Sequence, residues 1–157
     1  MKKRGKNALV LFFSKTGHTE RAAEEVAAGL ESAGISATVK GFADTDPDEL
    51  KQYSLLAVGS PTHVGKPAKK VRGFMKGLPK KSLKGKRVAS FTSYGGSRGK
   101  HTIKVFKKLL KKKGAKDIVP GVAVKAGAPL SLWKGPDIRE DDLGKLSALG
   151  RALAGKK

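Results

Sequence analysis

A short segment rich in hydroxyl groups is the part of this chain best suited to ligand chemistry. It follows the apolar run 8–13, has the pattern S-x-T-G-x-T, and consists of Ser14, Lys15, Thr16, Gly17, His18 and Thr19. A phosphate dianion requires several donors converging on its oxygens, which three hydroxyls and the amides around a glycine can supply. A helix starting here would add its N-terminal N–H groups. The segment predicts a phosphate-binding loop, with an ordinary capped helix start as the alternative.

Two further polar segments also follow apolar runs. The second comes after residues 55–58, begins at Gly59 and continues with Ser60, Pro61, Thr62, His63, Val64 and Gly65. The third starts at Thr92, after residues 87–91, and includes Ser93, Tyr94, Gly95, Gly96, Ser97 and Gly99. Because loops after parallel strands meet at the carboxyl edge of an open α/β sheet, the first two segments are expected to form one site.

Other catalytic and metal-binding patterns are weaker. G-x-x-x-x-G-K-[ST] is absent, no G-x-G-x-x-G follows a predicted strand, and no elbow motif suggests a Ser-His-Asp arrangement. The three histidines, His18, His63 and His101, fall in or just after the three segments, so a three-histidine metal site is an alternative. No i,i+4 histidine pair supports it. We expect no catalytic residue and no metal ligand, with His18 and His101 capping or solvating helix starts.

Apolar periodicity predicts the elements that position these segments. Strands are expected over residues 8–13, 35–39, 55–58, 87–91 and 118–124, and helices over 19–33, 67–78, 100–113 and 137–153. A short helical start is expected at 46–50, with Pro47 at its first position. Strands alternating with helices predict the α/β class, with a doubly wound, five-stranded parallel sheet. All 157 residues are expected to form a single domain.

Charge is concentrated in one part of the chain. The 34 Lys and Arg residues against 13 Asp and Glu give a net charge of +21. Residues 50–116 contain 20 of the basic residues and no acidic one, so almost the whole excess lies there. Cysteine is absent, which excludes disulfides and cysteine-ligated clusters. No run is long enough for a membrane span or a signal-peptide core, so cytoplasmic residence without membrane insertion is expected.

The three segments, in this order, resemble those of the flavodoxin family. Gly59-Ser60-Pro61-Thr62 is similar to the family's GSPT turn beside the isoalloxazine ring, and residues 92–99 resemble the third flavin loop of diiron flavoproteins. The resemblance implies flavin mononucleotide (FMN) as cofactor and a flavodoxin-like three-layer sandwich with strand order 2-1-3-4-5. It implies that the residues given above for all three segments, except Gly59 and Thr92, bind the cofactor. Tyr94, His63 and Trp133 are the candidates to flank the flavin.

The resemblance implies a protein that shuttles electrons between redox partners. One alternative is an FMN-dependent NAD(P)H or quinone oxidoreductase. Another is a basic nucleic-acid-binding module, which lacks support because aromatic residues are not interleaved with the lysines. Flavodoxins proper are acidic whereas this chain is basic, so the expected partner is an acidic redox protein, ferredoxin-like or a reductase, docking on lysine-rich helices. The remaining alternative is that the lysine face is only solvated and has no role in docking a partner.

Overall fold

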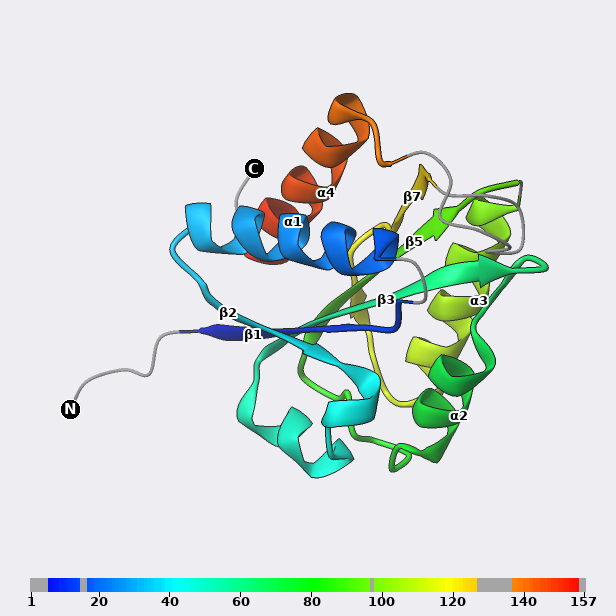
Figure 1. Cartoon of the computed structure of the whole chain (residues 1–157). Coiled ribbons are helices and arrows are strands. Elements are labelled where there is room, and N and C mark those ends of the chain that lie inside the picture. Colours follow the sequence, from blue (N-terminus) through cyan, green and yellow to red (C-terminus); the bar gives the residue numbers. More distant parts are fainter. Residues whose placement is uncertain (1–5, 15–16, 97, 127–136, 156–157) are drawn as a thin grey trace.

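The computed structural model describes residues 6–14, 17–96, 98–126 and 137–155 (Figure 1). The strands are β1 (Asn7–Phe12), β2 (Ser36–Gly41), β3 (Leu55–His63), β4 (Lys66–Pro67), β5 (Arg87–Tyr94), β6 (Asp117–Ile118) and β7 (Val122–Lys125). The α-helices are α1 (His18–Ser32), α2 (Lys69–Gly77), α3 (Gly99–Lys112) and α4 (Glu140–Leu153). Two 3-10 helices, η1 (Phe42–Asp44) and η2 (Pro47–Gln52), follow β2.

The sheet has the predicted doubly wound order. Its strands run β2-β1-β3-β5-β6, and every pairing along this path is parallel. The predicted fifth strand is divided into β6 and β7, which both pair with β5 in parallel. The interruption, residues 119–121, contains Pro120, whose ring nitrogen carries no hydrogen for the ladder.

Strands β3 and β5 extend further than the sequence predicted. Residues 59–63 were expected to be a loop, but they continue β3, and Thr92 to Tyr94 continue β5. Ser60 pairs with Thr92 and Pro61 with Ser93. The prediction was wrong because glycine and proline usually end strands. Here β1 pairs with β3 only as far as Gly59, so Pro61 is beyond that neighbour and costs no ladder bond on that side.

Helices cover both faces of the sheet, giving the predicted three layers (Figure 1). On one face α1 and α4 pack together over Ala8 and Val10 of β1. On the other face α2 and α3 pack together over Leu9 and Leu11. Alternate residues of β1 therefore enter two separate cores, which explains why this strand is apolar throughout.

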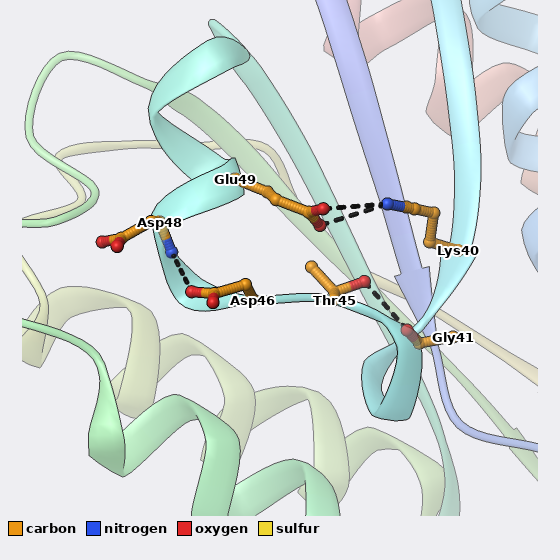
Figure 2. Close-up of polar contacts among 6 residues, drawn as sticks. All are labelled: Lys40, Gly41, Thr45, Asp46, Asp48 and Glu49. Carbon is orange, nitrogen blue, oxygen red and sulfur yellow. Dashed lines mark hydrogen bonds and ion pairs between the residues drawn. The ribbon is translucent and has the colours of Figure 1, made fainter.

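The connection after β2 is folded by local polar contacts (Figure 2). Thr45 Oγ1 donates to the Gly41 carbonyl at 2.9 Å, and Asp46 Oδ1 accepts from the Asp48 N–H at 2.9 Å. Asp46 thus caps η2, the short helical start predicted at 46–50. Lys40 Nζ lies 3.1 Å from Glu49 Oε2, which ties η2 to β2.

Candidate functional site

The first segment forms the start of α1, as predicted. Gly17 is the N-cap residue, at φ 95°, and no side chain caps the helix there. Ser14 Oγ accepts a hydrogen bond from the Gly17 N–H at 2.9 Å. A Cβ on Gly17 would have no atom within 4 Å, so space is open beside the turn. Lys15 and Thr16 lie outside the described residues.

Thr19 does not point its hydroxyl into that open space. The residue is 1% exposed, and its Oγ1 lies 2.9 Å from Oγ of Ser93 in a buried hydrogen bond. This bond joins the first segment to the third, across 74 residues of sequence. The sequence predicted that both residues lie at one edge of the sheet, but nothing in it indicated that they bond to each other. Their contact with the cofactor stays a prediction.

The hydroxyls of the second segment also bond within the protein. Ser60 Oγ accepts from the Ala68 N–H at 2.8 Å, which holds the start of α2 against β3. Thr92 Oγ1 donates to the Ser60 carbonyl at 2.6 Å and lies 2.8 Å from Thr62 Oγ1. Because the single proton of Thr92 goes to the carbonyl, Thr62 is the donor in the threonine pair. These buried groups make the sheet edge rigid.

A tight hairpin follows, which the sequence did not predict. His63 pairs with Lys66 in antiparallel fashion, leaving Val64 and Gly65 as a two-residue turn with φ 53° and 75°. Positive φ at both positions defines a type I′ turn. The Nδ1 of His101 lies 2.7 Å from the Gly65 carbonyl. A carbonyl only accepts, so Nδ1 carries the hydrogen and α3 holds the turn.

The structure corrects two expectations about histidine. His101 remains exposed, but its Nδ1 bonds across to the Gly65 carbonyl instead of capping the start of α3. His18 is not solvated, since it is 4% exposed, with Nδ1 3.6 Å from Oδ1 of Asp137. Among the described residues, no group of three or more His, Asp or Glu side chains is placed to hold a metal ion.

The third segment lines an open depression beside α3. Its volume is about 470 Å³, and it is lined by Tyr94, Gly96, Arg98, Gly99, Lys100 and Lys125. A Cβ on Gly99 would lie 2.4 Å from the Tyr94 ring, so only glycine lets this ring pack against the helix start. The lining is cationic and aromatic. Gly95 joins β5 to Gly96, while Ser97 and Trp133 lie outside the described residues.

A second depression, of about 560 Å³, lies at the start of α1, and Gly17, His18 and Arg21 are among the residues that line it. Its lining includes the carboxylates of Glu20, Glu24 and Asp137. Carboxylates repel an anion, so the part of this depression that they line does not suit a phosphate group. The Gly17 turn suits one better, because the N-terminal N–H groups of α1 lack a side-chain cap and a glycine leaves room beside them. The residues present therefore fit a phosphate-bearing ligand.

Comparison with known proteins decides the family. The family model described as flavodoxin matches residues 10–132. This chain belongs to the flavodoxin family. FMN, the cofactor expected from the sequence, is the cofactor of flavodoxins. No helix within the described part of the chain has the length and apolar character needed to cross a bilayer.

Individual flavodoxin relatives agree with this assignment. A flavodoxin of Megasphaera elsdenii is 33% identical over 92 residues, which cover 57% of this chain and 66% of that protein. An NAD(P)H dehydrogenase (quinone) of Azorhizobium caulinodans is 33% identical over 115 residues, 58% of each chain. The chain thus spans less than two thirds of these relatives. A solved archaeal flavodoxin superposes with a TM-score of 0.76 at 27% identity, covering 95% of this chain and 96% of that one.

Proposed function

We propose that this chain is an FMN-binding electron carrier whose residues 1–157 form one flavin-binding domain. The observation that carries the proposal is the convergence of three segments at one sheet edge, joined by the Thr19–Ser93 bond, in a member of the flavodoxin family. Bound FMN would supply the redox chemistry by accepting and releasing electrons. The cytoplasmic location expected from the sequence stays a prediction.

The protein's own part is to bind, orient and partly shield this group. The Gly17 turn and the first N–H groups of α1 would hold the phosphate. The hairpin after β3 and the Tyr94 segment would flank the ring, because β3 and β5 are neighbours and end together. Buried hydroxyl bonds among Ser60, Thr62 and Thr92 keep this edge in one conformation, so little order remains to be gained on binding.

An electron carrier and a turnover enzyme can be distinguished directly. Because one relative is an NAD(P)H dehydrogenase (quinone), catalytic turnover of NAD(P)H and a quinone is the second function to test. The FMN-loaded protein should exchange electrons with a one-electron protein acceptor while showing no steady-state NAD(P)H–quinone turnover above free FMN. Sustained turnover saturating in both substrates would establish the enzyme instead.

The docking partner we propose is an acidic redox protein. The exposed lysines of α2 and α3 form what we call the Lys-rich face: Lys69, Lys70, Lys76, Lys100, Lys104, Lys107, Lys108, Lys111 and Lys112. The two helices pack side by side (Figure 1), and residues 50–116 contain no carboxylate to neutralise them. Steering by this face predicts an association rate that falls steeply with salt. An association rate that does not change with salt would indicate that the Lys-rich face is only solvated and docks no partner.

A further inference from the structure

One apolar side chain stands out on the surface. Val64 is 65% exposed, and no other large hydrophobic side chain of the described residues is classed as exposed. It occupies the first position of the type I′ turn between β3 and β4. A singly exposed apolar residue would need no explanation if its backbone were ordinary.

The backbone at Val64 is not ordinary. Its φ of 53° lies in the left-handed region, which a β-branched residue adopts only at an energetic cost. Asparagine or glycine fits this turn position without that cost. Val64 therefore carries two unfavourable features at once, exposure and strain. Strain of this kind is a pointer to function rather than to stability.

Residues at the start of α3 also hold the turn in position. His101 Nδ1 donates to the Gly65 carbonyl at 2.7 Å, so α3 fixes the turn from one side. A Cβ on Gly65 would lie 3.1 Å from both Arg98 Nε and His101 Nδ1, so these side chains pack close to the turn. The Val64 side chain is thus presented on a preformed support, which lowers the entropy lost on contact.

Cationic side chains surround this apolar tip. Lys66 follows the turn and is exposed, and Arg98, which packs against Gly65, is exposed as well. Lys100 stands one residue before His101 on α3 and is also exposed. Carboxylates are absent from residues 50–116, to which all these groups belong. An apolar centre within a charged rim is the usual anatomy of a protein–protein contact.

We propose that Val64 is the central contact of the docking surface for an acidic redox protein, entering a shallow apolar depression ringed by that partner's carboxylates. The proposal rests on the proposed function and deepens it, because it names where on the basic surface the partner docks. The turn is the tip of the hairpin proposed to flank the flavin ring, so a partner docked on the exposed Val64 side chain would receive an electron over a short path. Nucleic acid fits less well, because unpaired bases stack on aromatic side chains and valine offers none.

The test uses FMN-saturated, chemically reduced protein in anaerobic stopped flow. Two acceptors are compared: an acidic blue-copper protein and a basic c-type cytochrome of similar size. Each encounter passes one electron from the flavin to the acceptor's metal, which is reduced by one. At low salt the acidic acceptor should react at least 10-fold faster, and the advantage should shrink as salt is added.

The decisive variant is Val64→Asn, which keeps the turn and removes its apolar tip. Its thermal midpoint should equal or exceed that of the wild type, because the strain is relieved. Its rate with the acidic acceptor should fall 5- to 10-fold more than its rate with ferricyanide, a small one-electron acceptor that needs no docking surface. Arg98→Gln should lower both the rate and its salt dependence. Lys111→Gln, at the far end of α3, should change the rate less than 2-fold.

Four results would overturn the inference. The first is a Val64→Asn rate with the blue-copper protein equal to that of the wild type. The second is an equal loss of both rates, which would place Val64 at the flavin rather than at the partner. A faster reaction with the basic cytochrome than with the acidic blue-copper protein would indicate that the partner is basic. Competition by random duplex DNA at physiological salt would favour a nucleic-acid partner. A wild-type protein that fails to bind FMN would instead overturn the proposed function, and this inference with it.

Discussion

At the scale of single residues, the hydroxyl groups that drew attention in the sequence serve the protein before any ligand. Thr19, Ser60, Thr62, Ser93 and Thr92 are buried and bond to one another or to the backbone. Sequence predicted that these residues gather at one edge. It could not predict their partners, because a hydroxyl rotates to whichever neighbour the packing supplies.

The Thr19–Ser93 bond should be measurable as a coupling between two segments of the site. Ser93→Ala removes a buried partner of the Thr19 hydroxyl and should cost about 1–3 kcal/mol of unfolding free energy. Thr19→Val should cost a similar amount, and the double variant should cost less than the sum. Urea unfolding of the four proteins gives the coupling energy. Strict additivity would show that the 2.9 Å contact contributes nothing.

At the scale of elements, apolar periodicity placed every long helix and core strand within a few residues. It failed where polar residues extend a strand, as in β3, and where a proline divides one, between β6 and β7. It also missed the hairpin, because Val-Gly lacks the Asn-Gly signal of a type I′ turn. The extension of β3 and the hairpin lie at the ligand edge, where tertiary contacts outweigh local preference, whereas Pro120 divides the outer strand near the middle of its length.

The crossing of α1 and α4 depends on two glycines that periodicity did not single out. A Cβ on Gly150 would lie 2.1 Å from the Val26 carbonyl, and one on Gly29 would lie 2.0 Å from the Ser147 carbonyl. Gly150→Ala should therefore destabilise the protein by about 1–3 kcal/mol through overpacking. Gly144→Ala, in the same helix with open space around it, should stabilise by about 0.5–1 kcal/mol. Thermal unfolding checks both, and equal effects would contradict this packing.

Lys86 joins η2 to the start of β5 and should make stability depend on pH. Its Nζ donates to the carbonyls of Leu50 and Tyr53, and burial lowers the pKa of Lys86 below its ordinary 10.5. The unfolded chain then binds more protons than the folded chain between the lowered pKa and 10.5. Stability from this group should accordingly rise with pH across that window and be smallest below it.

The matched pair Lys86→Met and Lys84→Met isolates this effect. Lys84 is exposed, so its replacement should leave the pH dependence of unfolding unchanged. Lys86→Met should remove the rise toward alkaline pH. Denaturant midpoints at pH 8 and pH 10 measure the difference. Identical pH profiles for Lys86→Met and wild type would contradict the assignment.

At the scale of the whole molecule, the Lys-rich face reaches the sheet edge where the proposed site lies. The Lys-rich face covers α2 and α3, and the start of α3 reaches the edge where β3 and β5 end. Composition alone revealed the excess of charge, and the alternation of strands with helices predicted that it would form one face. The sequence could not predict the exposed Val64 turn beside this face, because a positive φ at valine has no sequence signal.

The central claim is that the edge built by these three segments binds FMN through its phosphate. Titration of the apo-protein with FMN and with riboflavin, followed by flavin fluorescence, tests it most directly. A charge-assisted contact contributes about 1.5–3 kcal/mol, so losing the phosphate should weaken binding at least 10-fold. FMN bound at least 10-fold tighter than riboflavin is the predicted result. Equal affinity for the two flavins, or no binding of either, would contradict the account.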